Sequence, residues 1–169
     1  PFFQRHYVWD EDNWKELLES LENNEVKPFL GSIILKRTND SCGVSEAIIV
    51  DGQQRLTTLT ILAKAIHDSI PNISSDSGIR RDIEGFLFYK KNSADNFSDS
   101  YIKIQHSRLD INDYTKVINA GLIGGEDTIN YETNINKESG RILKCYKYFR
   151  ERLENKTINE LNNLHNSMF

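Results

Sequence analysis

The alternation of hydrophobic and polar positions predicts a short strand followed by a long helix near the middle of the chain. Ile48 to Val50 form an apolar, β-branched run that is typical of a buried strand. Asp51 and Gly52 interrupt this run, and from Leu56 to Ile66 the apolar residues recur with helical spacing. Because this helix is apolar on nearly every side, we expect it to be central and buried, and to end before Pro71.

Similar patterns on the N-terminal side predict a helix and a second strand. An amphipathic helix is predicted from about Asp12 to about Asn23. Its apolar residues follow the helical spacing i, i+3, i+4 and i+7, as Trp14, Leu17, Leu18 and Leu21 do. Phe29 to Leu35 read as a buried strand. The polar segment Lys36 to Glu46 carries turn residues, so we expect it to join the two strands as a hairpin loop.

The second half of the chain is predicted to be mainly helical. The pattern at 79–89 fits a helix, with a strand as the alternative for its last residues, and 101–104 alternate as an edge strand would. Asp110 is expected to cap a helix closed by Gly121. Two further helices follow, one with a stripe of Ile142, Cys145, Tyr146, Phe149 and Leu153, the other with a capping box of Thr157 and Glu160.

These elements predict an α/β or α+β fold, a small mixed sheet flanked by helices with an additional helical region towards the C-terminus. We expect residues 1–70 to form the core. Residues 71–169 would complete the same domain, with loops at 71–78, 90–100 and 121–134.

The composition is that of an ordinary globular protein, since 38% of the 169 residues are hydrophobic and 27% are charged. The formal net charge of −4 gives no global basic field to attract nucleic acid, so any DNA contact requires a local patch. The candidates for such a patch are Lys36, Arg37, Arg80, Arg81, Lys90 and Lys91, which are equally compatible with a solvated surface.

The two cysteines, Cys42 and Cys145, belong to no C-x-x-C pair, which argues against a disulfide framework and a zinc ribbon. No apolar run has the length of about 20 residues that a membrane helix needs. We therefore expect a cytoplasmic protein with no membrane contact. The chain begins at Pro1 inside an aromatic motif, which suggests a piece of a longer protein.

The candidate chemistry lies where the central strand meets the central helix, in the sequence DGQQR. A helix start presents unpaired N–H groups and the positive end of the macrodipole, and so attracts anions such as phosphate. An ordinary helix start would explain Asp51 as a cap, Gly52 as a turn and Arg55 as a surface cation. Gln53 and Gln54 add two amides, which together with the guanidinium can orient water and grip oxyanions.

Two neighbouring groups of residues extend this candidate site. Thr57 and Thr58 follow in the first turns of the helix, where their hydroxyls either touch a phosphate or its metal, or bond to the backbone. The N-terminal segment PFFQRHYVWD supplies Gln4 and Arg5 among aromatic residues. An arginine there can grip a phosphate, whereas the aromatic rings are equally compatible with core packing.

The segments PFFQRHYVW, FLGSIIL and IVDGQQRLTTL, in this order, resemble the N-terminal domain of GmrSD-type modification-dependent restriction enzymes and related phage-defence proteins. That domain is grouped with the ParB and sulfiredoxin fold. The resemblance is specific over residues 1–66 and looser over 101–164. It implies a nucleotide-binding domain with nucleoside triphosphatase activity, fused in full-length members to a His-Asn-His nuclease domain or acting with such a partner subunit. These 169 residues contain no nuclease motif.

The expected mechanism is phosphoryl transfer from a nucleoside triphosphate to water, which depends mainly on positioning and charge stabilisation. The helix start and Arg55 would hold the phosphates, and Arg5 would reach them from the N-terminal segment. Gln53 or Gln54 would orient the attacking water. Asp51 would hold Mg²⁺, directly or through water. No G-x-x-x-x-G-K-[ST] loop or H-E-x-x-H motif is present, which argues against a P-loop enzyme and a zinc hydrolase. The alternatives are a nucleotide sensor without hydrolysis and a DNA-contacting, ParB-like module without catalysis. A sulfiredoxin-like reductase would need a cysteine in the glycine-containing segment, here DGQQR, and this chain has none there, which argues against that activity.

Overall fold

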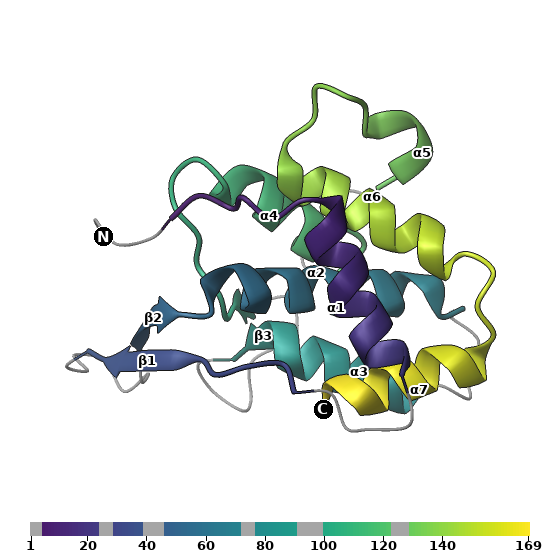
Figure 1. Ribbon diagram of the computed structural model, residues 1–169, viewed down its shortest axis with the longest axis horizontal. Coiled ribbons are helices and arrows are strands. Elements are labelled where there is room, and N and C mark those ends of the chain that lie inside the picture. The colour runs from purple at the N-terminus through teal and green to yellow at the C-terminus, as the bar shows by residue number, and fades with distance from the viewer. Residues whose placement is uncertain (1–4, 24–28, 39–45, 72–76, 91–99, 123–128) are drawn as a thin grey trace.

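A computed structural model of the chain shows an α+β fold built around one long helix, α2 (Gln53–Ser69) (Figure 1). The structure describes residues 5–23, 29–38, 46–71, 77–90, 100–122 and 129–169. Within these residues there are seven helices and two separate two-stranded sheets, which confirms the predicted α+β class. No helix in the described part is long and apolar enough to cross a membrane.

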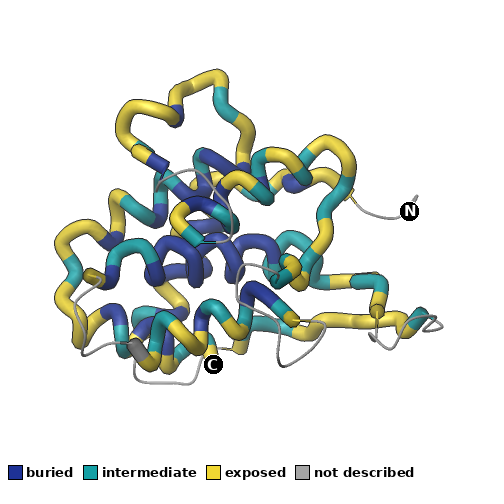
Figure 2. Tube along the Cα trace, turned by 180° about the vertical axis from the view of Figure 1, so that it is seen from behind, coloured by how far each residue is buried: buried dark blue, intermediate teal, exposed yellow. Residues whose placement is uncertain are grey.

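Helix α2 is the centre of the hydrophobic core. All of its residues from Thr57 to His67 are buried, as the apolar pattern predicted, and Figure 2 shows the buried part of the chain concentrated around it. The helix ends at Ser69, and Ile70 leaves it in an extended conformation just before Pro71. A helix buried on every side must bring its few polar groups into contact with partners, because unpaired buried polar groups are costly.

Five helices pack around this centre. Helices α3 (Ser77–Leu87), α4 (Ile111–Asn119), α6 (Arg141–Leu153) and α7 (Ile158–Met168) contact α2, while α1 (Glu11–Glu22) lies across α6 and α7. The stripe predicted on α1 is buried, and so is the stripe on α6. Thr157 and Glu160 form the predicted capping box of α7. The periodicity of these helices therefore identified their core-facing sides correctly.

The hairpin prediction is confirmed, but the prediction that its strands are buried is wrong. Strands β1 (Ile34–Arg37) and β2 (Ala47–Asp51) pair antiparallel, and no residue of either strand is classed as buried. Phe29, expected in the first strand, precedes it and is 90% exposed. An apolar run indicates only which residues could be buried, not what covers them. The two strands project away from the helices that enclose the core, so their apolar side chains stay partly or fully exposed (Figure 1).

The remaining elements resolve the ambiguous patterns. The segment at 79–89 contains both alternatives, since α3 runs directly into β3 (Phe88–Tyr89), which pairs with β4 (Tyr101–Ile102). The predicted edge strand at 101–104 is thus present but shorter. Tyr131–Asn134, within a range expected to be loop, forms the short helix α5, whose first turn is capped by the Asn130 side chain.

A buried ionic network lies at the C-terminal end of α2. Lys64 is completely buried and pairs with Asp68 one helical turn later. Burial acts to raise the pKa of Asp68, but hydrogen bonds from His67, Lys64 and Tyr146 outweigh it and lower that pKa. Burial also lowers the pKa of Lys64, although Asp68 opposes this effect. Removal of either partner would leave the other charge buried without its closest counter-charge, which would destabilise the fold.

We expect Lys64→Met to destabilise the protein by about 3–5 kcal/mol, because it leaves the Asp68 carboxylate buried without its nearest cation. Urea denaturation followed by circular dichroism measures this change in the free energy of unfolding. The matched control is Lys15→Met, which removes the lysine of an exposed pair of the same spacing with Glu19 and should cost less than about 1 kcal/mol. Equal losses in the two variants would contradict a special role for the buried pair.

Candidate functional site

The N-terminal segment, residues 5–10, lies extended across the beginning of α2 and is anchored by Tyr7. The Tyr7 hydroxyl lies 2.6 Å from Thr58 Oγ1 and accepts a hydrogen bond of 2.8 Å from Trp14 Nε1. It also donates to Cys145 Sγ at 3.4 Å. Burial, together with Cys145, raises the pKa of Tyr7, so that its hydroxyl stays protonated. Tyr7 is therefore a core residue rather than an exposed stacking platform.

The two glutamines of DGQQR hold this segment in place. Gln54 Oε1 accepts hydrogen bonds from the N–H groups of Val8 at 2.7 Å and Trp9 at 3.4 Å, and Gln54 Nε2 donates to His6 O at 2.8 Å. Gln53 Oε1 accepts from the Arg5 N–H at 3.2 Å, and Gln53 Nε2 donates to Ile49 O at 2.7 Å. Both amides therefore join the backbone of other segments to the first turn of α2.

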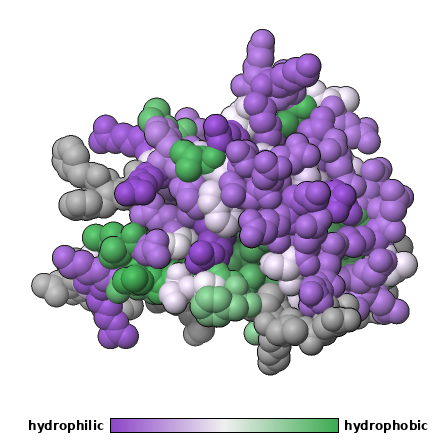
Figure 3. Space-filling model, in the orientation of Figure 1, coloured by the Kyte–Doolittle hydropathy of each residue, from purple (hydrophilic) through white to green (hydrophobic). Residues whose placement is uncertain are grey.

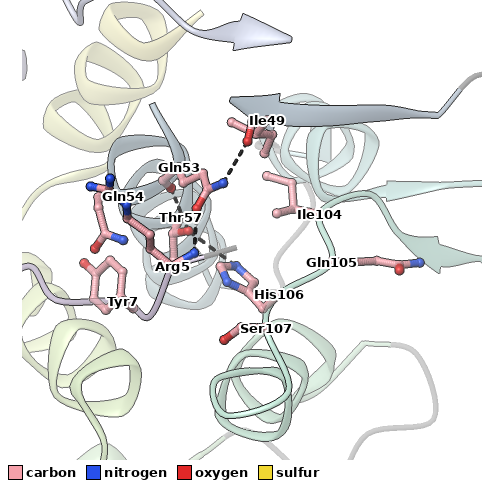
Figure 4. A pocket seen from close by; sticks show the side chains of 10 residues that line it. All are labelled: Arg5, Tyr7, Ile49, Gln53, Gln54, Thr57, Ile104, Gln105, His106 and Ser107. Carbon is pink, nitrogen blue, oxygen red and sulfur yellow. Dashed lines mark hydrogen bonds between the residues drawn. The ribbon is translucent and has the colours of Figure 1, made fainter. Parts of the chain in front are cut away.

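A small cavity lies between this segment, the first turns of α2 and the segment after β4. Figure 4 shows the side chains that line it, which come from these three parts of the chain and, at Ile49, from β2. They are Arg5, Tyr7, Ile49, Gln53, Gln54, Thr57, Ile104, Gln105, His106 and Ser107. Its volume of about 20 Å³ accommodates roughly one water molecule, so a triphosphate would have to lie at its mouth.

His106 is one of the cavity residues that the sequence pattern did not indicate. Its Nε2 lies 3.4 Å from Thr57 Oγ1, and its ring packs 4.0 Å, centroid to centroid, from the ring of Tyr114. Burial lowers its pKa to about 4, although the charge of Asp110 acts in the opposite direction. His106 is therefore neutral at physiological pH. No local signal could have identified it, because it belongs to an irregular segment brought to α2 by tertiary packing.

Asp110 does not cap α4, which corrects the prediction made for it. It occupies the N-cap position in a helical conformation, without a side-chain capping bond. Its Oδ2 instead accepts hydrogen bonds from Tyr7 N at 3.1 Å and Ser107 Oγ at 2.9 Å, and lies 3.3 Å from His6 Nδ1. The carboxylate thus ties the N-terminal segment to the 104–110 segment at the far side of the cavity.

The other members of DGQQR lie outside the cavity lining. Asp51 is exposed at the end of β2. Gly52 begins α2 with a positive φ of 87°, where a Cβ atom would lie 3.1 Å from Ile33 Cγ1. Arg55 turns towards the segment before β1, donates to Ser32 O at 3.2 Å, and lies so close to Gly31 that a Cβ there would be 2.5 Å from its Nη1. Gly31 therefore makes room for this guanidinium.

The two threonines bond to the backbone of α2. Thr57 Oγ1 donates to Gln53 O and Thr58 Oγ1 donates to Gln54 O, both at 2.8 Å. Both residues are buried, and only Thr57 lines the cavity. The structure thus brings Arg5, Gln53, Gln54 and Thr57 together around the cavity, whereas Thr58 does not line it.

The start of α2 has no side-chain cap among the described residues. Gly52 at the N-cap has no side chain, and the first turn contains no carboxylate. In α7, by comparison, Thr157 and Glu160 satisfy the first turn. The macrodipole at the start of α2 is therefore not compensated by an acidic side chain within its first turn, which favours an external anion.

The remaining predicted residues contribute little to this site. Gln4 and Lys91 lie outside the described residues. Of the basic residues considered for a DNA patch, Arg80 donates to the carbonyls of His67 and Ile70, where it stabilises the end of α2. Lys36 and Arg37 lie on the exposed strand β1.

We expect Gln54→Met to release the N-terminal segment, because it removes the partners of three backbone groups at little change in side-chain length. Hydrogen exchange should show faster exchange of the Val8 amide. Gln53→Met is the counterpart, since it should expose the Arg5 amide and leave Val8 protected. Unchanged exchange at Val8 in the Gln54 variant would show that the hydrogen bonds of the Gln54 side chain to the N-terminal segment, which we call the clamp together with those of Gln53, are not formed in solution.

We expect stability to fall as the pH decreases from about 6.5 towards 4, because protonation of His106 is favoured in the unfolded chain over the folded one. The full contribution is present above the unfolded pKa, and the shift corresponds to about 3 kcal/mol at most. Urea denaturation at several pH values measures it, and His106→Gln should flatten the curve in this window. A variant with the same slope as the parent protein would exclude His106 as the cause.

One of the comparisons with known proteins identifies the family of this chain. No curated protein matches the chain. The family model described as the GmrSD restriction endonuclease, N-terminal domain, matches residues 1–168, and so covers both the clamp at Gln53 and Gln54 and the helices that surround α2. The chain therefore belongs to the family of N-terminal domains of GmrSD restriction endonucleases.

Proposed function

We propose that this domain binds and hydrolyses a nucleoside triphosphate at the start of α2, as the regulatory module of a restriction endonuclease. The observation that carries the proposal is that Arg5 and the uncapped first turn of α2 line the same cavity. An exposed guanidinium beside a positive helix end attracts phosphate, and the guanidinium can bind two phosphate oxygens at once.

The phosphates would lie at the mouth of the cavity, because its volume admits only about one water molecule. Arg5 would contact them from the N-terminal segment. Arg55, whose guanidinium lies over Gly31, would reach them from the side of β1 if it left the carbonyl of Ser32. In this arrangement Gln53 and Gln54 hold the segment that carries Arg5, and a water molecule in the cavity would lie next to them.

Asp51 suits a magnesium ion that accompanies the triphosphate. It is an exposed carboxylate one residue before the N-cap, and Mg²⁺ in nucleotide sites is typically held by one or two carboxylates together with phosphate oxygens. When bound there, the ion would neutralise charge on the phosphates. No group of three or more metal-ligating side chains occurs among the described residues, so the protein would supply only part of the coordination.

One observation favours the second candidate, a nucleotide sensor without hydrolysis. Every amide group of Gln53 and Gln54 already bonds to the backbone, so neither side chain is free to turn towards an attacking water without releasing the N-terminal segment. Binding of a triphosphate would then change the attachment of this segment, and through it the state of the nuclease.

Calorimetric titration with a nucleoside triphosphate and Mg²⁺ tests binding, and phosphate release tests hydrolysis. We expect Arg5→Ala to weaken binding at least about tenfold, because it removes a bidentate contact to phosphate, and Arg55→Ala to abolish phosphate release. Arg152→Ala, which removes an exposed arginine of α6 outside the cavity, is the control. Binding without release supports the sensor, and equal binding by the Arg5 and Arg152 variants overturns the site.

A further inference from the structure

A second, larger depression lies on the other side of the N-terminal segment, between the start of α1 and α6. It has a volume of about 680 Å³, within the range of small-molecule binding sites. The face that carries α1 and α6 is largely hydrophilic (Figure 3), yet the groove contains three aromatic side chains. Trp14 is buried, whereas Trp9 and Tyr148 are partly exposed.

Two of the aromatic side chains, Trp9 and Tyr148, are partly exposed in the groove, and Trp14 is buried behind them. The rings of Trp14 and Tyr148 lie 5.8 Å apart, centroid to centroid, and are inclined at 52°. Trp14 is fixed by its hydrogen bond to Tyr7 and so provides a rigid base for the groove. Rigid, partly exposed aromatic rings bind other planar rings by stacking, at little cost in side-chain entropy.

Cations line the α6 side of the groove. Helix α6 carries five cationic side chains and one carboxylate, in a chain whose net charge is −4. Of the cations in the groove, Arg141 donates to Val8 O, and Lys147 donates to Ile135 O and lies 3.8 Å from Glu151. Among the described residues, Lys137 and Lys144 have no hydrogen-bonding or ion-pair partner for their side chains. These two ammonium groups remain to bind an anion.

The groove also contains carboxylates, which limit the choice of ligand. Asp10 and Glu11 stand at the start of α1, where they compensate its macrodipole. A long polyanion would approach these carboxylates and the rest of α1, which carries four more carboxylates and one lysine. A small ligand with one anionic group avoids this repulsion, and its hydroxyl or amino groups can donate to Asp10 or Glu11.

From these observations we propose that the groove binds a nucleoside monophosphate, with its base against Trp9 and Tyr148 and its phosphate at Lys137 and Lys144. The site is distinct from the cavity at α2. Only the N-terminal segment separates them, since Val8 is held by Gln54 on one side and by Arg141 on the other. The proposal does not depend on nucleoside triphosphate binding at α2.

Tryptophan fluorescence provides a direct readout, because both tryptophans of the chain line the groove. Titration of the whole chain with adenosine 5′-monophosphate, without Mg²⁺, should give a saturable change. Lys144→Glu and Lys137→Ala should each weaken binding, the former at least about tenfold because it reverses the charge beside the phosphate. Lys116→Glu, an exposed change of the same kind on α4, is the matched control and should bind like the parent protein.

Four results would overturn the proposal. The first is the absence of a saturable change with the monophosphate. The second is unchanged affinity in both the Lys137 and Lys144 variants, when circular dichroism shows that they are folded. The third is loss of binding in Arg5→Ala, which would place the ligand at α2. An oligothymidylate that binds more than about tenfold tighter, with a steep dependence on salt, would identify a single strand as the ligand instead. Failure of triphosphate binding in the Arg5 variant leaves the groove result unaffected.

Discussion

The hydroxyl of Tyr7 joins four parts of the molecule at one buried point. It contacts Thr58 in α2, Trp14 in α1 and Cys145 in α6, and its own residue belongs to the N-terminal segment. These partners come from distant parts of the sequence, so the contact forms only when the helices have assembled. Because the hydroxyl is buried, each lost partner would leave a polar group unsatisfied in the core. The position of the N-terminal segment, and with it that of Arg5, therefore depends on the packing of the entire helical core.

This dependence explains how the two motifs of the sequence act together. The Tyr7 side chain anchors the segment in the core, and the amides of Gln53 and Gln54 on α2 bind its backbone. Asp110 holds the same backbone by accepting a hydrogen bond from Tyr7 N. Residues 5–9 and the DGQQR segment are consequently held together as one structural unit, in which the glutamines bind the backbone and the side chains of Arg5 and Arg55 are the groups able to contact an anion. Arg141 extends this unit to α6 through Val8.

The helices and their buried faces could be predicted from the sequence because helical periodicity is a local property, as the stripe of α1 and the long apolar helix α2 demonstrate. The exposure of β1 and β2 could not, because burial of a strand depends on what covers it. The candidate site was predicted in part. Arg5, Gln53, Gln54 and Thr57 meet as expected, whereas His106 and the role of Asp110 depend on long-range contacts that no local pattern records. The bonding of Gln54 to the backbone of residues 6, 8 and 9 is likewise a product of tertiary structure.

The hairpin of β1 and β2 exposes Ile34, Leu35 and Val50, and Figure 3 shows hydrophobic residues gathered on this side of the molecule. A two-stranded ribbon leaves backbone donors and acceptors along its outer edges, and apolar side chains beside such edges favour intermolecular strand pairing. Lys36 and Arg37 follow directly after the apolar run on β1, where their charges oppose the stacking of one ribbon on another. Two adjacent cations at the end of β1 are therefore the feature of this hairpin that opposes its pairing with a second copy.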